Sequence, residues 1–163
     1  MKSQKHYQMM LWPALITITL DQLSKLAVVR YLHVHASIPL VDGFVNLVHV
    51  RNRGMAFGLM NRSDLEVAFY ALIIISLAAI AIILFWLFKF EQEEGRIIFG
   101  LSLILGGAVG NLIDRLRLHE VVDFLDFYLG AYHWPAFNLA DTAITVGTFW
   151  VVVNLIFKNK KQI

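Results

Sequence analysis

Three apolar stretches of bilayer-spanning length constrain this chain more than any other feature of its sequence. Val67–Phe88, Ile97–Ile113 and Thr142–Phe157 contain no charged residue. A helix of about 20 apolar residues crosses the hydrocarbon core of a bilayer. The stretches therefore predict three transmembrane helices.

A fourth apolar stretch, Tyr7–Leu20, is interrupted by Asp21 and Lys25 before Leu26–Val29 resumes it. It is similar to a secretory signal peptide, but no small-residue cleavage pattern follows it. We predict a retained first helix. With 58% hydrophobic and only 16% charged residues, the chain is predicted to be an all-α polytopic membrane protein. It forms one domain over residues 1–163, with helices at about 12–31, 66–88, 96–116 and 138–157.

Two longer loops, 33–64 and 117–137, separate the predicted helices. In the first loop, Ile38–Val41 and Phe44–Val50 flank Asp42-Gly43, a dipeptide typical of a two-residue hairpin turn. We therefore predict a small extracytoplasmic β-sheet on the membrane surface. Seven Lys and Arg residues lie in the termini and the short loop between the second and third helices, and seven lie elsewhere. Several of the second group fall at helix ends and not in free loops, which favours cytoplasmic termini.

Composition excludes several kinds of chemistry. The chain has no cysteine, so it has neither a disulfide nor a thiolate nucleophile. A net charge of +2 is too balanced for a general nucleic-acid binder, and we expect no nucleic-acid partner.

Acidic residues gather at the facing ends of the last two predicted helices: Asp114, Glu120, Asp123, Asp126 and Asp141. An ionisable residue at membrane depth costs at least about 2.5–3.5 kcal/mol, which marks it as a functional candidate. Asp141 lies in an apolar segment three residues after Asn138, so both project from one helix face. A structural carboxylate that caps the last helix is the alternative.

Asp123 lies between Val122 and Phe124, which would hold it against the membrane surface, where desolvation raises a carboxyl pKa. We expect Glu120 and Asp126 to be solvated loop acids. Two carboxylates brought together do not both ionise easily. One member then activates water while the protonated member hydrogen-bonds the scissile carbonyl, which is aspartic-peptidase chemistry without metal or cofactor.

Two alternatives stay open on the residues alone. His119-Glu120-Val121-Val122-Asp123 is one residue short of the zinc-protease pattern H-E-x-x-H, and His133 is a possible third ligand. A non-enzymatic transporter or scaffold subunit with Asp141 as a proton site is the other. A transporter is expected to show repeated halves or broken helices, whereas these acids lie at helix ends.

Other polar and small residues are candidates for support of such a site. Asp21 and Lys25 are spaced i, i+4 and predict a structural ion pair. Gly106–Gly110 forms a G-x-x-x-G face that favours close helix packing. The remaining candidates are Asn111, Asp114 and Arg115 on one helix face, and Asn52 and Gly54 beyond the predicted strands.

Five motifs occur together in this order: Asp21-Gln22-x-x-Lys25, Asn52-x-Gly54-x-Ala56-Phe57-Gly58, Gly106-Gly107-Ala108-x-Gly110-Asn111-x-x-Asp114-Arg115, Val121-Val122-Asp123-Phe124 and Phe137-Asn138-x-Ala140-Asp141. In these motifs the chain closely resembles the lipoprotein signal peptidases (signal peptidase II), which are bacterial inner-membrane aspartic peptidases with four helices. The resemblance covers about residues 12–158. Met55 departs from it, since the family usually has Ala there.

The resemblance implies removal of the signal peptide from prolipoproteins, just before a cysteine that carries diacylglycerol. It implies cytoplasmic termini, an extracytoplasmic site and no cofactor, and we expect a monomer among membrane lipids. It assigns catalysis to Asp123 and Asp141. Site support falls to Asn52, Gly54, Asn111, Arg115 and Asn138, and structural roles to Asp21, Lys25 and Asp114.

The topology can be tested by placing single cysteines in this cysteine-free chain. We expect Ser63→Cys to react with an impermeant thiol reagent in intact spheroplasts, because the 33–64 loop is predicted to lie outside. Ser3→Cys and Gln92→Cys should react only after lysis. The reverse labelling pattern would overturn the predicted orientation.

Overall fold

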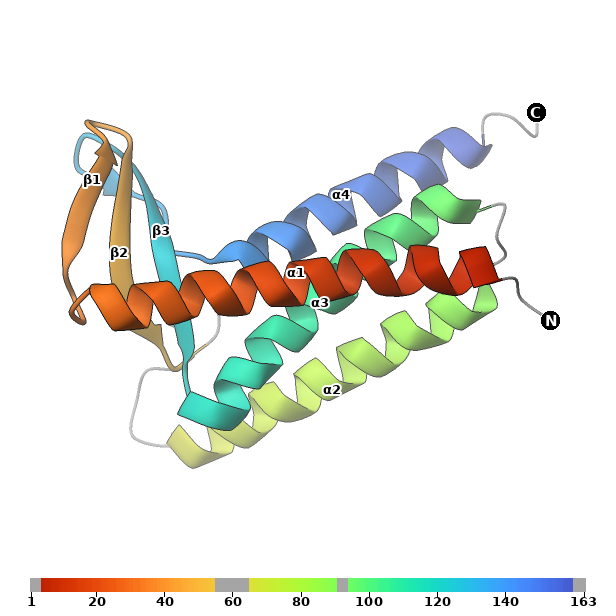
Figure 1. The fold of residues 1–163 in the computed structure, drawn as a ribbon, viewed down its shortest axis with the longest axis horizontal. Coiled ribbons are helices and arrows are strands. Elements are labelled where there is room, and N and C mark those ends of the chain that lie inside the picture. Colours follow the sequence, from red (N-terminus) through yellow and green to blue (C-terminus); the bar gives the residue numbers. More distant parts are fainter. Residues whose placement is uncertain (1–3, 55–64, 91–93, 160–163) are drawn as a thin grey trace.

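Four helices form a bundle, and a small sheet stands at one end of it (Figure 1). The structure is a computed structural model that describes residues 4–54, 65–90 and 94–159. The labelling positions Ser3, Ser63 and Gln92, as well as Met55, lie outside the described residues. The elements in chain order are α1 (Gln4–Tyr31), β1 (Ser37–Val41), β2 (Val45–Asn52), α2 (Leu65–Lys89), α3 (Gly95–Leu118), β3 (Val121–Leu129), β4 (Tyr132–His133) and α4 (Leu139–Asn159).

Three helices in the described part of the chain are long and apolar enough to cross a membrane. They cover Glu66–Lys89, Gly95–Leu118 and Leu139–Phe157. Helix α1, which carries Asp21 and Lys25 near its middle, is not among them. Helix α1 also begins at Gln4, well before the predicted start near residue 12, so Pro13 lies inside it.

Helix α1 buries one narrow stripe and exposes an apolar opposite face. The buried side chains recur every three or four residues, which is the period of one helix face: Met10, Ala14, Thr17, Asp21, Lys25 and Val28. Large exposed side chains on the other face are Leu11, Trp12, Leu15, Ile16, Leu23 and Leu26. An apolar outer face with charges turned inward is the arrangement of a helix in contact with lipid.

Helix α3 lies at the centre of the bundle and packs against each of the other three helices. Glycines allow the close approach of α1. A Cβ atom at Gly106 would lie 2.7 Å from Thr17 Cβ, and one at Gly110 would lie 2.6 Å from Asp21 Oδ2. Small residues at helix interfaces let backbones approach closely in membranes. Gly110 therefore leaves the space that the Asp21 carboxylate occupies.

The sheet is antiparallel, with strand order β1-β2-β3-β4. The predicted hairpin is present, and Gly43 adopts a positive φ of 79° in its turn, a conformation that suits glycine. The interhelical segment 117–137, for which no strand was predicted, contains β3 and β4. Strand β3 pairs with β2, so that Asp123 lies opposite Val50. His119, in the left-handed region at φ 60°, ends α3 two residues before β3.

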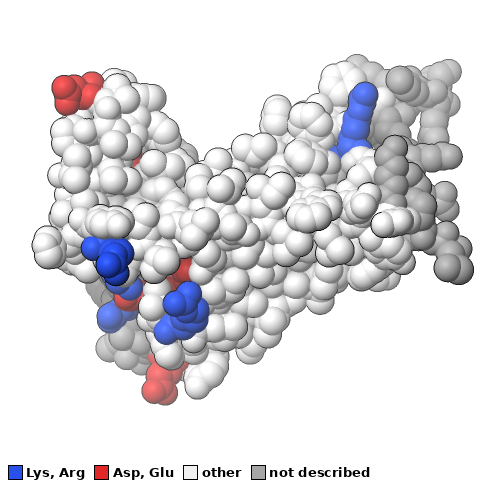
Figure 2. Space-filling view, in the orientation of Figure 1, with Lys and Arg blue, Asp and Glu red and all other residues white. Residues whose placement is uncertain are grey.

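Helix α1 begins and helix α4 ends at the end of the bundle opposite the sheet (Figure 1). In the space-filling view, Lys, Arg, Asp and Glu gather mainly near the sheet, and the visible flank of the bundle between its ends is almost free of them (Figure 2). This distribution matches a bundle whose middle contacts hydrocarbon, because charged side chains are costly there.

Candidate active site

Asp123 lies in β3, one of the two inner strands of the sheet, and is only 2% exposed. Its Oδ2 accepts a hydrogen bond from Asn52 Nδ2 at 3.0 Å, and its Oδ1 accepts one from Asn138 Nδ2 at 2.7 Å. Burial, and to a smaller extent the charge of Asp141, raise the pKa of Asp123 to about 7, although both amide hydrogen bonds act in the opposite direction. Asp123 therefore exchanges its proton near neutral pH.

Asp141 lies in the first turn of α4 and forms a capping box with Asn138. Asn138 Oδ1 accepts a hydrogen bond from the Asp141 N–H at 2.9 Å, and Asp141 Oδ2 accepts one from the Asn138 N–H at 3.2 Å. This reciprocal pair satisfies two backbone donors at the helix start. Asp141 Oδ1 also accepts a hydrogen bond from Asn111 Nδ2 at 2.8 Å. The capping alternative for Asp141 thus describes a real contact, and the same carboxylate also faces a cavity.

The cavity has a volume of about 480 Å³ and lies between the sheet and the start of α4. Both Asp123 and Asp141 line it, together with four of the predicted supporting residues: Asn52, Gly54, Asn111 and Arg115. Asn138 is fully buried and connects the two aspartates from behind. Residues from β2, α3, β3 and α4 thus meet at one cavity, although they are far apart in the sequence.

Asn52 and Arg115 approach the cavity from different elements. Asn52, the last residue of β2, accepts a hydrogen bond from the Gly54 N–H at 3.0 Å through Oδ1, which leaves its Nδ2 to donate to Asp123. Arg115, near the end of α3, donates to the Asn111 carbonyl oxygen at 3.4 Å. Its guanidinium lies close enough to Asp123 and Asp141 for charge attraction. Arg115 thus places positive charge beside the two carboxylates.

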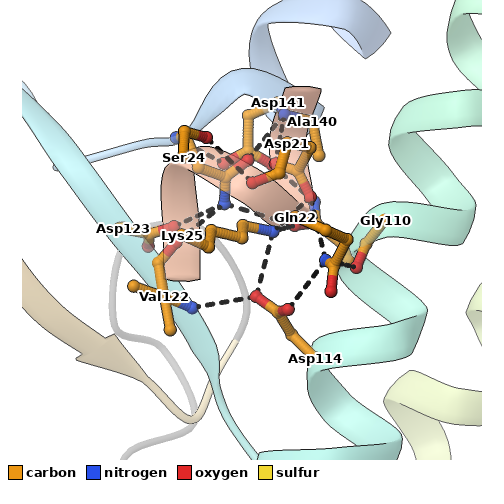
Figure 3. A network of polar contacts seen from close by, with 12 residues as sticks. Asp21, Gln22, Ser24, Lys25, Gly110, Asp114, Val122, Asp123, Ala140 and Asp141 are labelled. Atoms are coloured by element: carbon orange, nitrogen blue, oxygen red, sulfur yellow. Dashed lines mark hydrogen bonds and ion pairs between the residues drawn. The ribbon is translucent and has the colours of Figure 1, made fainter. Parts of the chain in front are cut away.

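A buried ion triad lies beside the cavity (Figure 3). Lys25 Nζ lies 2.9 Å from Asp21 Oδ2 and 2.9 Å from Asp114 Oδ2, and all three side chains are at most 4% exposed. Lys25 also donates to Asn111 Oδ1 at 3.0 Å. Sequence spacing predicted the contact between Asp21 and Lys25, but the second anionic partner of Lys25 comes from α3 and has no local signature.

Several residues beside the ion triad or in the cavity wall were not among the predicted site residues. Gln22 donates to the Gly110 carbonyl oxygen at 3.2 Å and to Asp114 Oδ1 at 3.0 Å, and so links α1 to α3. The segment before α4 forms an apolar part of the cavity wall with Trp134, Pro135, Ala136 and Phe137. The sequence signal for this wall was the apolar segment around Pro135, directly before the Asn-x-x-Asp pattern that begins the last helix.

The residues of the zinc alternative face different partners. His119 stacks on Phe69, with ring centroids 4.6 Å apart. Glu120 forms ion pairs with Arg51 and Arg53. Within the described ranges, no group of three His, Asp or Glu side chains is placed to hold a metal ion. These positions do not support a ligand set of His119, Glu120, Asp123 and His133.

The expectation that Glu120 and Asp126 are solvated loop acids was wrong. The Glu120 side chain is 12% exposed between its two arginines. Asp126, which is 8% exposed, accepts hydrogen bonds from Asn46 Nδ2 and contacts His133 Nδ1, both at 3.0 Å. The strand pairing of β2, β3 and β4 brings these partners to the acids, and sequence neighbours alone do not reveal it.

A carboxylate pair on one cavity within a bundle of apolar helices is the arrangement of a membrane-embedded aspartic peptidase. The family model described as signal peptidase (SPase) II matches residues 13–157. The chain therefore belongs to the signal peptidase II family, and the transporter or scaffold alternative is wrong.

Relatives and solved structures agree with this assignment. The lipoprotein signal peptidase of Desulforapulum autotrophicum is 52% identical over 144 residues, which cover 87% of this chain and 88% of that protein. The lipoprotein signal peptidase of Syntrophus aciditrophicus is 43% identical over 147 residues, covering 90% and 91%. A bacterial membrane enzyme structure obtained by the in meso method at 2.3 Å resolution superposes with a TM-score of 0.82 and 26% identity, covering 93% of this chain and 89% of that one.

The two roles of Asn138 can be separated by substitution. Asn138→Ser keeps a capping oxygen, whereas Asn138→Ala removes it, so Ser should be more stable than Ala by about 1 kcal/mol. Both variants lose the amide that donates to Asp123, and both should lose peptidase activity by about 100-fold. Thermal unfolding and cleavage assays in detergent would measure these effects. Recovery of activity in Asn138→Ser would show that only the cap matters.

Proposed function

We propose that Asp123 and Asp141 are the catalytic pair of this signal peptidase, and that cleavage occurs just before the lipid-modified cysteine of a prolipoprotein. One observation carries the proposal. Both carboxylates line the same cavity and share contacts with one buried residue, Asn138, whose amide binds Asp123 and whose backbone N–H binds Asp141. Membership of the family, whose members remove signal peptides from prolipoproteins, supports this reading.

The two aspartates take different roles because their surroundings differ. Asp123 is the more buried of the two, and its pKa of about 7 lets it hold a proton at neutral pH. In its protonated form Asp123 donates a hydrogen bond to the scissile carbonyl oxygen, while Asp141 takes a proton from the attacking water. The tetrahedral intermediate gains negative charge on the former carbonyl oxygen, and Arg115 offers compensating positive charge from the cavity wall.

The wall of the cavity suits an extended apolar peptide. Its apolar residues include Trp134, Phe137, Ile144 and Val146, the last of which is half exposed on α4. Gly54, which has no side chain, also lines the cavity. We propose that the signal peptide lies along this wall and that the diacylglycerol chains leave the cavity toward the bilayer along α4.

We further propose that all four helices span the bacterial inner membrane, with cytoplasmic termini and the sheet and cavity outside. The start of α1 and the end of α4 lie at the end of the bundle opposite the sheet (Figure 1), and the sequence near its C-terminus contains Lys158, Lys160 and Lys161. Helix α1 turns its two central charges inward and an apolar face outward, which supports its insertion. We propose a monomer surrounded by membrane lipids.

The catalytic pair is tested by near-isosteric substitution. Asp123→Asn and Asp141→Asn should each lower cleavage by about 10³-fold or more, because an amide neither accepts a proton from water nor presents an acidic one. The double variant should be scarcely slower than either single variant, as expected for residues that act as a unit. Turnover of a lipid-modified prolipoprotein by purified enzyme is the measurement.

The matched control for these variants is Asp42→Asn, the same change at an exposed residue in the β1–β2 turn, which should cleave normally. Chelators should have no effect, and His119→Ala and Glu120→Gln should retain substantial activity. Near-normal cleavage by Asp141→Asn, or a loss on chelation that zinc restores, would refute the aspartic mechanism.

The role of Asp123 as the acid also predicts the pH dependence. Asp123 loses its proton as the pH rises through about 7, so kcat/KM should fall on the alkaline side by about tenfold per pH unit. Asp42→Asn should show the same alkaline limb as the unmodified enzyme. A profile that stays flat between about pH 6 and 9 would contradict the assignment of Asp123 as the acid.

A further inference from the structure

The ion triad of Asp21, Lys25 and Asp114 joins two helices, α1 and α3, at a single ammonium group (Figure 3). Lys25 Nζ has three N–H donors, and three acceptors lie within 3.0 Å of it: Asp21 Oδ2, Asp114 Oδ2 and Asn111 Oδ1. The ammonium group is therefore fully used by the protein, and α1 is held against α3.

Each acid of the triad also accepts a hydrogen bond from the backbone N–H of a residue that precedes a proposed catalytic aspartate. Asp21 Oδ1 accepts a hydrogen bond at 2.9 Å from the N–H of Ala140, which precedes Asp141. Asp114 Oδ2 accepts one at 3.2 Å from the N–H of Val122, which precedes Asp123. The triad thus reaches the backbone immediately before both aspartates.

The third donor of Lys25 helps to fix the orientation of the Asn111 side chain. An ammonium group only donates, so the amide must turn its oxygen toward Lys25. The Asn111 Nδ2 is then directed away from Lys25, where it donates to Asp141 Oδ1 at 2.8 Å. Asn138 Nδ2 also donates to Asn111 Oδ1, at 3.2 Å, so loss of Lys25 removes the shorter of the two contacts that hold this oxygen away from Asp141.

Stability alone is a weak reason for such a triad. Removing charges from water carries a large desolvation cost, and well-packed apolar residues often stabilise a core as well as a buried ion pair does. The contacts instead converge on Val122, Ala140 and Asn111, which all lie next to or touch the two aspartates. The geometry therefore favours a role in placing these two side chains.

We infer that Asp21, Lys25 and Asp114 are positioning residues that set the relative placement of the Asp123 and Asp141 carboxylates. The inference rests on the proposed function, in which these two aspartates are the catalytic pair. It adds that the triad affects the rate of the chemical step in the folded enzyme, in addition to any contribution to folding. A triad that only stabilised the fold would leave the activity of each folded molecule unchanged.

The main test replaces the triad by neutral residues of similar size. In Asp21→Asn/Lys25→Met/Asp114→Asn, amide oxygens still accept from Ala140 and Val122, and no buried charge is left without a partner. We expect kcat per folded molecule to fall by about tenfold or more with KM unchanged, because the link to Asn111 and the common anchor are lost. Folded enzyme is quantified by size-exclusion chromatography and thermal unfolding.

A second variant covers the case in which the triple variant does not fold. Asp21→Asn keeps the ion pair of Lys25 with Asp114, but its single amide oxygen serves either Lys25 or Ala140. We expect kcat to fall by at least about threefold with KM unchanged. Leu87→Ala is the control, since Leu87 is fully buried in a hydrophobic core of α1, α2 and α3 residues that includes no member of the triad. It should lower thermal stability with kcat unchanged.

The outcomes separate this inference from the proposed function. Unchanged kcat in the triple variant or in Asp21→Asn overturns the positioning role, whereas the proposed function survives if Asp141→Asn is still inactive. Normal cleavage by Asp141→Asn overturns both. Failure of both triad variants to yield folded protein also overturns the inference, because the triad would then serve the fold itself.

Discussion

At the sheet end of the bundle, four elements are connected through the contacts of one buried cation, Lys25, and its two acidic partners. Lys25 is 3% exposed within a bundle of apolar helices, so its charge must be balanced by protein groups alone. Asp21 and Asp114 supply that balance, and the carboxylates are then available to bind the backbone at the starts of α4 and β3. One electrostatic requirement thereby ties α1, α3, β3 and α4 together.

Two buried amide side chains, those of Asn138 and Asn111, connect this network to the carboxylates of Asp123 and Asp141. Asn138 turns its oxygen toward the Asp141 N–H at the start of α4, so its nitrogen is left to face Asp123. Asn111 turns its oxygen toward Lys25, so its nitrogen faces Asp141. A side-chain amide has an oxygen that accepts and a nitrogen that donates hydrogen bonds. A neighbouring donor that fixes the oxygen therefore also fixes where the nitrogen points.

Local sequence predicted the helical part of this fold well. Uncharged stretches identified the three most apolar helices, because a helix in lipid satisfies its own backbone hydrogen bonds. The β1–β2 hairpin was also predictable from Asp42-Gly43, since that turn is local. Strand β3 was missed. Its residues Val121–Phe124 are all buried, so they lack the alternation of a half-exposed strand, and its pairing partner β2 lies far away in the sequence.

The sequence by itself determined the chemical inventory of this protein: an apolar chain without cysteine, with acids at helix ends and Asn-x-x-Asp at the start of the last helix. Such features follow from residue type and short spacing. Only the tertiary structure decided that Asp123 and Asp141 share a cavity, that Asp114 completes the charge balance of Lys25, and that Glu120 and Asp126 have strand and arginine partners. These contacts join residues on different elements, and burial and pairing exist only once the bundle and the sheet have packed together.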